Sequence, residues 1–228
     1  MSHRPGAHAE AEPEVLQGTI AAPIGDARRV GLFGGSFDPF HAGHLEPVVA
    51  ARRQLGLDRV IYLPTARPPH KPKRSFAPAY ARYAMVELAL LSEDGLYASP
   101  HELTLGRPAY TVETVEAFRR SFPEVAFRLL IGSDSLAELA TWRRWEELVA
   151  AVRLVVLARP GWEIERVAGE LPAELARRME AGEVDVVVHP VDRSATDVRR
   201  LLAAGEEPPA GALKPPVLDY IRKYSLYR

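Results

Sequence analysis

The sequence predicts a single α/β domain built on a doubly wound parallel sheet. Short apolar strands alternate along the chain with helices of about ten residues, an order that is typical of parallel β-α-β units. The strands lack polar/apolar alternation, as expected where helices cover both faces of a sheet. Residues 29–228 contain no internal repeat and no Ser/Gly linker, so one domain accounts for them.

Each expected strand is an apolar run that ends at residues typical of turns. The run 29–33, for example, stops at two glycines, Gly34 and Gly35. The full set of expected strands is 29–33, 59–63, 96–98, 125–131, 152–157 and 184–188. Ligands in such folds bind past the carboxyl ends of the strands. Polar segments follow three of these ends, at 34–44, 132–134 and 189–199.

The helices between the strands are indicated by apolar residues at helical spacing. Leu45, Val48 and Leu55 recur in this way, and Gly56 supplies a C-terminal stop. Further helices are expected at 79–91, at 111–122, around Leu136, around Trp145, at 172–181, from Ser194 onward and at 216–224.

Residues 1–28 are expected to form a disordered tail before the catalytic domain at 29–228. They are rich in Ala, Glu, Pro, Gly and His and show no sustained periodicity. They also lack the apolar stretch of a secretory signal. The absence of an export signal favours a cytoplasmic protein.

Composition excludes several classes of function. The 29 basic and 30 acidic groups leave a formal charge of −1, so no surplus attracts nucleic acid or anionic lipid. The absence of cysteine excludes disulfides, thiolate-bound zinc and a cysteine nucleophile. No run approaches the roughly 18 apolar residues of a membrane span. Neither charge nor composition selects an oligomeric state.

The segment 34–44, GGSFDPFHAGH, carries the clearest chemical signal. Two glycines allow a sharp turn and let a ligand approach backbone amides closely. His41 and His44 lie three residues apart at the start of the following helix, where free amides and the positive end of the helix dipole face the same way. This pattern predicts a phosphate-binding site. A metal half-site and two ordinary surface histidines are the alternatives.

The segment 34–44 resembles the T/H-x-G-H signature of the nucleotidyltransferase superfamily, in a form that is nearly that of bacterial nicotinate-nucleotide adenylyltransferases. Similar segments of that family follow in order between residues 30 and 227. They are the basic loop at 68–71, the R-x-S-Y-T segment at 107–111 with Ala109 in place of Ser, the G-x-D-S-L segment at 131–136 followed by Trp142, the segment 159–161, and the closing S-S/A-T-x-I/V-R motif at 194–199.

The resemblance implies transfer of adenylate from ATP to nicotinate mononucleotide, with release of pyrophosphate and formation of deamido-NAD. The nucleophile would be a phosphate monoester oxygen, which is ionised at pH 7 because its second pKa is about 6. An in-line attack then needs positioning and positive charge, but no general base and no covalent intermediate. Mg²⁺ is expected to arrive with ATP and to bridge its oxygens, without a metal site built from protein side chains.

The resemblance also assigns roles to individual residues. Catalysis would depend on His41, His44, Lys71 and Arg199, with His44 near the reacting α-phosphate. ATP would be bound by Gly34, Gly35, Ser36, Gly132, Asp134, Ser194 and Thr196. Nicotinate mononucleotide would contact Tyr110, Thr111, Trp142 and Arg159.

Several of these residues also suit plain structural roles. Trp142 suits packing, Asp134 a helix cap, and Arg159 a surface ion pair. The same holds for three further positions: Asp38 suits a brace of the Gly-Gly turn, and Arg82 and Glu102 suit structural ion pairs.

Rival functions differ in substrate or in class. Related enzymes adenylate nicotinamide mononucleotide or phosphopantetheine, although the latter look shorter and lack segments like 68–71 and the one at Trp142. A non-catalytic nucleotide sensor is expected to lose a histidine or the terminal arginine of the signature, yet His41, His44 and Arg199 are present. An RNA-binding relative of class I tRNA synthetases would need a further loop and an anticodon domain, which this chain lacks.

Overall fold

A six-stranded parallel sheet forms the centre of the molecule in the computed structural model, which describes residues 24–66, 76–158, 171–191 and 193–228. The strands are β1 (Arg29–Gly35), β2 (Arg59–Pro64), β3 (Leu96–Ala98), β4 (Ala126–Gly132), β5 (Arg153–Ala158) and β6 (Asp185–Val188). They lie in the order β3-β2-β1-β4-β5-β6, and all five pairings are parallel. The predicted doubly wound α/β fold is confirmed.

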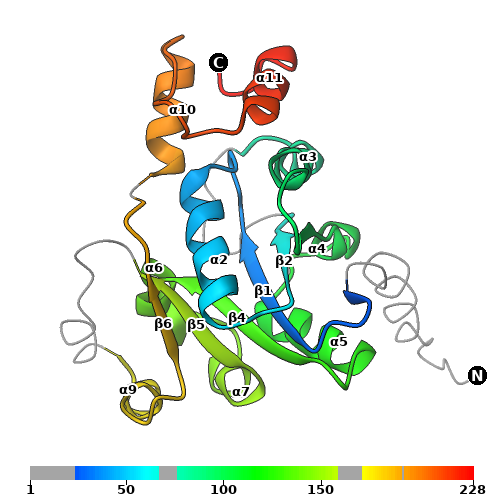
Figure 1. Ribbon diagram of the computed structural model, residues 1–228, viewed down its shortest axis with the longest axis vertical. Helices are drawn as coiled ribbons and strands as arrows, with labels where there is room; N and C mark the ends of the chain where they lie inside the picture. Colours follow the sequence, from blue (N-terminus) through cyan, green and yellow to red (C-terminus); the bar gives the residue numbers. More distant parts are fainter. Residues whose placement is uncertain (1–23, 67–75, 159–170, 192) are drawn as a thin grey trace, which may run out of the picture.

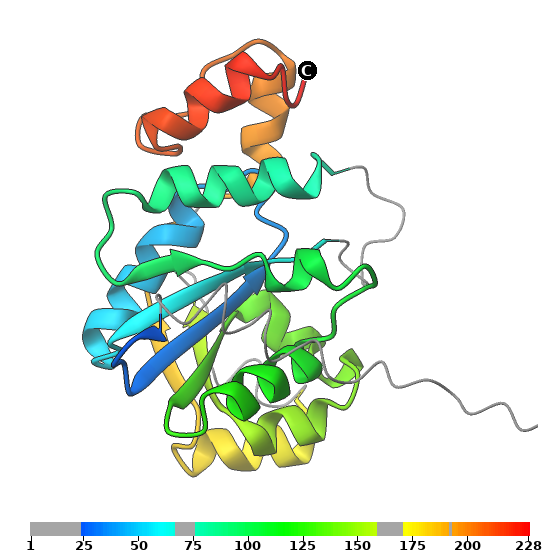
Figure 2. The same ribbon diagram turned by 90° about the vertical axis from the view of Figure 1, so that its right-hand side faces the viewer.

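Helices cover the sheet on both sides. The described helices are α2 (Ala42–Gln54), α3 (Ala79–Leu90), α4 (His101–Thr104), α5 (Thr111–Ser121), α6 (Ser133–Glu138), the 3₁₀ helix η1 (Leu139–Thr141), α7 (Trp145–Ala151), α9 (Ala173–Glu180), α10 (Ala195–Ala203) and α11 (Pro215–Lys223). Figure 2 shows the sheet edge-on, with α3, α10 and α11 above it and α5, α7 and α9 below it.

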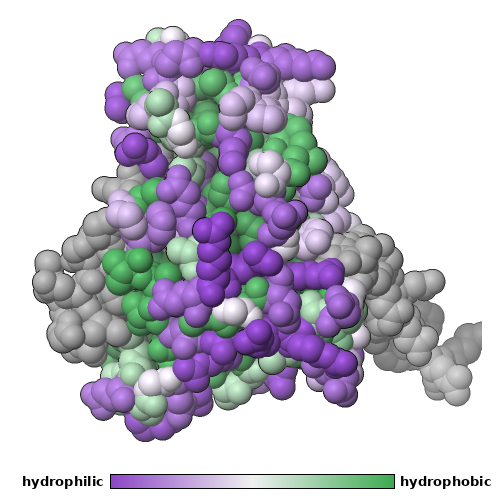
Figure 3. Space-filling view, viewed as in Figure 1, coloured by the Kyte–Doolittle hydropathy of each residue, from purple (hydrophilic) through white to green (hydrophobic). Residues whose placement is uncertain are grey.

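Alternate residues of the central strands enter two separate cores. In β1, Leu32 joins the core formed with α5 and α7, whereas Phe33 joins the core formed with α2, α3 and α11. Both faces of the strand are therefore buried, which explains why its sequence is continuously apolar instead of alternating. Hydrophilic side chains dominate the face of the molecule that carries α2, with smaller apolar patches between them (Figure 3).

The strand order reverses direction between β1 and β4. From β1 the chain proceeds outward to β2 and β3, and then returns past β1 to β4. A reversal of this kind leaves a crevice at the carboxyl ends of the two central strands. Figure 1 shows α10 and α11 together beyond that end of β1, so the last helices of the chain adjoin the crevice.

The structure differs from the sequence-based expectation in two places. Helix α4 is an additional element; a four-residue helix is too short to show a periodic pattern. The folded part also begins before residue 29, because Ile24 and Ala27 are buried in the core beside α5. The rest of the expected tail, residues 1–23, lies outside the described residues. None of the described helices is long and apolar enough to cross a membrane.

Candidate active site

The turn between β1 and α2 brings the two histidines of the signature together. His41 is the N-cap of α2, and its Nδ1 atom accepts a hydrogen bond from the amide of Gly43 at 3.0 Å. The Nδ1 atom of His44 accepts from the amide of His41 at 3.4 Å, and the centres of the two rings lie 3.9 Å apart. These reciprocal bonds form a capping box in which histidines replace the usual hydroxyl and carboxylate residues.

The capping box determines which nitrogen of each ring carries the proton. A neutral imidazole has one acceptor nitrogen and one N–H donor. Because Nδ1 of both His41 and His44 accepts from the backbone, the donor of each neutral ring is Nε2. Two N–H donors therefore come from one helix N-terminus, where the dipole of α2 also favours negative charge. This arrangement suits phosphate oxygens.

Glycines are required at two positions of this turn by close contacts. A Cβ atom at Gly35 would lie 2.8 Å from the ring of Phe37, and one at Gly43 would lie 2.9 Å from the carbonyl oxygen of Arg193. The second contact means that the start of α2 lies directly against the segment that leads into α10. At Gly34 the equivalent position is open, so a ligand can approach this backbone closely.

Buried aromatic residues pack against His44 and fix its position. Its ring lies 5.1 Å from that of Phe37 and 5.6 Å from that of Phe40, and its carbonyl oxygen accepts a hydrogen bond from the hydroxyl of Tyr62 at 3.1 Å. Phe37, Phe40 and Tyr62 are fully buried. The ring of His44 is thus held in place by residues that do not themselves reach the solvent.

The closing motif meets the opening turn through Arg199 of α10. Its Nη1 atom donates to the carbonyl oxygen of Asp38 at 2.5 Å, and its Nη2 atom donates to the hydroxyl of Thr196 at 3.0 Å. The hydroxyl of Ser194 caps α10 by accepting from the amide of Asp197 at 3.1 Å. The N-terminus of a second helix and a guanidinium group therefore lie next to the Gly-Gly turn.

The end of β4 supplies another predicted part of the site. Gly132 is the extended N-cap residue of α6, and Asp134 is exposed in the first turn of that helix. Because β1 and β4 are paired in parallel up to Phe33 and Leu130, both strands end at the same edge of the sheet. The prediction that these segments share one edge of the sheet is consistent with this pairing.

The residues expected to bind the second nucleotide also lie near one another. Tyr110 is the N-cap of α5, directly before Thr111, and Trp142 follows η1. The guanidinium of Arg143 lies 4.6 Å from the centre of the Tyr110 ring, which links the two segments. Tyr110 and Trp142 are half-buried against the core beside α5. Contacts with this core bury part of the Trp142 side chain.

A chain of hydrogen bonds connects these residues with the Gly-Gly turn. The amide of Thr65 donates to the carbonyl oxygen of Gly35 at 3.0 Å, and the side chain of Thr65 bonds to Glu102. Glu102 accepts from the hydroxyl of Thr114 at 3.0 Å, and the amide of Thr114 bonds to Tyr110. Burial raises the pKa of Glu102 to about 7, although the two threonine hydrogen bonds act in the opposite direction.

Arg82 of α3 holds several of the same turns from inside the protein. It is fully buried and donates to the carbonyl oxygens of Ser36, Thr65, Ala66 and Ala77, at 2.6 to 3.1 Å. The burial lowers its pKa. Within the described residues, these bonds to carbonyl groups stand in place of the ion pair considered from the sequence. One feature of the sequence could have indicated this buried role: Arg82 is a single arginine on the apolar face of α3 that also carries Met85 and Val86.

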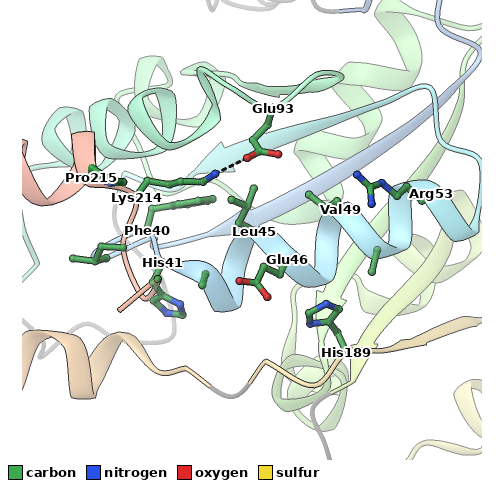
Figure 4. A pocket seen from close by; sticks show the side chains of 14 residues that line it. Phe40, His41, Leu45, Glu46, Val49, Arg53, Glu93, His189, Lys214 and Pro215 are labelled. Carbon is green, nitrogen blue, oxygen red and sulfur yellow. Dashed lines mark hydrogen bonds and ion pairs between the residues drawn. The ribbon is translucent and has the colours of Figure 1, made fainter. Parts of the chain in front are cut away.

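A pocket of about 500 Å³ opens beside His41 (Figure 4). Its floor is formed by Phe40, Leu45 and Val49, and an ion pair between Lys214 and Glu93, 2.7 Å long, crosses one wall. The pocket shares His41 with the predicted site and extends along the outer side of α2. It therefore gives space next to His41. Two predicted site residues, Lys71 and Arg159, lie outside the described residues.

Comparisons with known proteins show which family the chain resembles. The sequence family described as cytidylyltransferase-like matches residues 32–201. The chain is 39% identical over 209 residues to a probable nicotinate-nucleotide adenylyltransferase of Aeromonas salmonicida, covering 87% of this chain and 97% of that protein. It is 38% identical over 201 residues to one of Neisseria meningitidis, covering 88% and 98%. A solved structure of Plasmodium falciparum nicotinic acid mononucleotide adenylyltransferase complexed with NaAD shares the fold, with a TM-score of 0.68 at 18% identity, over 88% of this chain and 97% of that one.

Proposed function

The chain belongs to the cytidylyltransferase-like family, and within it to the nicotinate-nucleotide adenylyltransferases, and from that premise we propose that it transfers adenylate from ATP to nicotinate mononucleotide. The products are deamido-NAD and pyrophosphate. One observation carries the proposal: the guanidinium of Arg199 reaches the turn that also presents His41 and His44. Two anions must meet in this reaction, and cationic groups and amide donors converge where they would meet.

The chemistry needs charge stabilisation more than proton transfer. The attacking phosphate is already ionised at pH 7, because its second pKa is about 6. The Nε2–H groups of His41 and His44 and the fork of Arg199 would bind phosphate oxygens and stabilise the charge that moves onto pyrophosphate. We propose a direct in-line displacement without a covalent intermediate. Removal of one such donor from an enzyme costs about a hundredfold or more in turnover.

The remaining ATP contacts would come from backbone amides and one carboxylate at three segments that border the crevice. Gly34, Gly35 and Ser36 offer amides at the first turn, and the amides around Ser194 and Thr196 lie at the N-terminus of α10. Gly132 and Asp134 at the end of β4 suit a ribose, since a carboxylate accepts from hydroxyl groups. The pocket beside His41 is large enough to receive a further part of a nucleotide held there.

The second nucleotide would bind at the start of α5. The ring of Trp142 offers a face for a pyridine ring, and Tyr110 with the amides near Thr111 lies close by. A nicotinate carboxylate would be attracted by the amides of a helix N-terminus. Lys71 and Arg159 stay predicted phosphate contacts.

Magnesium would enter with ATP. In the part of the chain that the structure describes, no three His, Asp or Glu side chains lie close enough together to hold a metal ion. The N–H groups of imidazole, guanidinium and backbone amides at the crevice suit phosphate oxygens. When bound with ATP, Mg²⁺ would supply further positive charge at the phosphates. The cytoplasmic location stays a prediction.

The direct test combines the chain with ATP, Mg²⁺ and nicotinate mononucleotide. We expect equal amounts of pyrophosphate and deamido-NAD, measured by a coupled phosphate assay and by chromatography, and neither product when one substrate is omitted. Tight ATP binding without release of pyrophosphate would instead support the rival function of a nucleotide sensor.

A further inference from the structure

Asp38 connects three distant segments of the chain beneath the phosphate-binding turn. It is 1% exposed. Its Oδ1 atom accepts from the hydroxyl of Tyr227 at 2.7 Å and from the amide of Ala77 at 3.2 Å. Its Oδ2 atom lies 3.9 Å from Nη1 of Arg199, which donates to the carbonyl oxygen of Asp38 instead. The carboxylate and the guanidinium are thus adjacent, but they are not engaged as a closely bonded pair.

The backbone after α11 turns back to bring Tyr227 to this position. Ser225 and Tyr227 both adopt left-handed conformations, with φ of 52° and 66°. Such conformations are unfavourable for residues with a side chain, and they persist where surrounding contacts require them. Here the ring of Tyr227 packs against the core formed with α2, α3 and α11, and its hydroxyl reaches Asp38.

The hydroxyl of Tyr227 stays a donor throughout the working pH range. Burial and the adjacent Asp38 carboxylate raise its pKa far above the ordinary value, whereas the nearby Arg82 and Arg199 act in the opposite direction with smaller effects. A neutral phenol next to a buried carboxylate donates its proton to that carboxylate in a charge-assisted hydrogen bond. Part of the acceptor capacity of Asp38 is therefore already used.

We propose that Tyr227 is a positioning residue for ATP, which acts through Asp38 to keep Arg199 directed at the phosphates. A guanidinium forms its most favourable pair with a carboxylate when two parallel N–H···O bonds can form. Asp38 is close enough to compete with ATP for Arg199 in this way. The hydrogen bond from Tyr227 keeps Oδ1 of Asp38 away from the guanidinium of Arg199. It also lowers the attraction of the Asp38 carboxylate for that guanidinium. Tyr227 itself touches no substrate. The inference rests on the proposed function only in that Arg199 binds ATP.

The test compares Tyr227→Phe with Tyr224→Phe, a matched control at an exposed tyrosine on the same part of the chain. We expect Tyr227→Phe to raise the KM for ATP about tenfold, because one charge-assisted bond is lost. Its kcat should change less than about twofold, and its KM for nicotinate mononucleotide should not change. Tyr224→Phe should match the wild type. A purely structural role would change all three parameters together with the melting temperature, and that result would overturn the proposal.

A second pair of variants tests the route through Asp38. In Asp38→Asn the competing charge is absent, so the addition of Tyr227→Phe should change the KM for ATP less than about twofold. A full tenfold increase in that background would contradict the proposed route. Calorimetry with ATP and Mg²⁺ measures the same effect as a Kd without turnover. A wild type that makes no deamido-NAD would therefore refute the proposed function, whereas equal ATP affinities of wild type and Tyr227→Phe would refute this inference.

Discussion

The guanidinium of Arg199 and the backbone carbonyl of Asp38 form a 2.5 Å hydrogen bond across 161 residues of sequence. The bond joins the N-terminal region of α10 to the turn after β1, and it is complemented by the close contact between Gly43 and the carbonyl of Arg193. Two helix N-termini and one guanidinium are therefore assembled around one crevice. This assembly makes specific predictions about single side chains.

The ring of His44 should be required for turnover but not for folding. We expect His44→Ala to lower kcat by about two orders of magnitude, because an N–H donor to the phosphates is removed. His44→Gln should be equally inactive, yet it should melt at the wild-type temperature, since a glutamine at this position can still accept from the N-cap amide. Steady-state kinetics and thermal melts measure both effects. An active His44→Gln variant would show that the cap, and not the imidazole, matters.

Arg199 should be sensitive to replacement by lysine. Its fork makes two bonds at once, to Asp38 and to Thr196, and an ammonium group does not reproduce that geometry. We expect Arg199→Lys to lower kcat/KM for ATP about tenfold and Arg199→Ala about a hundredfold. The neighbouring Arg200 is exposed on the same helix, so Arg200→Lys serves as the matched control. Similar losses in the Arg199 and Arg200 variants would remove Arg199 from the site.

Glu102 should make stability fall with rising pH. Burial raises its pKa from 4.5 to about 7. Between these values the unfolded chain has lost the proton that the folded protein still holds, so the free energy of unfolding decreases as pH increases, by up to about 1.4 kcal/mol per pH unit. The stabilisation is complete below about pH 4.5 and is lost above about pH 7.

Denaturant unfolding of Glu102→Gln checks this sign. Relative to the wild type, the variant should gain about 2 kcal/mol between pH 5 and pH 7, because its amide does not ionise. Glu124→Gln, at an exposed glutamate, should follow the wild type at every pH. A pH-independent difference between wild type and Glu102→Gln would mean that Glu102 does not titrate in this range.

The acid form of the pyridine nucleotide should be the preferred substrate. We expect kcat/KM to be at least tenfold higher with nicotinate mononucleotide than with nicotinamide mononucleotide, a difference of about 1.4 kcal/mol. The expected physical cause is attraction between the nicotinate carboxylate and the amides at the start of α5. Competition assays with both nucleotides measure the ratio directly. Equal efficiencies would exclude a carboxylate-specific contact.

Much of the fold follows from local patterns. Short apolar runs predicted all six strands within one or two residues, because a buried parallel strand needs only its own side chains to be apolar. Helix α4 escaped prediction because four residues are fewer than a periodic pattern requires. The predicted domain, which starts at residue 29, does not include Ile24 and Ala27, since these are isolated apolar residues that become buried only in the assembled core.

The sequence by itself determined the fold class and the family, and it predicted which segments would carry the site, because these depend on the order of residues along the chain. Only the tertiary structure decided how those segments meet. It gave Arg82 four carbonyl partners, and it brought the hydroxyl of Tyr227 within hydrogen-bond distance of Asp38. Contacts of this kind join residues far apart in sequence, so no local pattern records them; they exist once the sheet brings the ends of its strands to one edge.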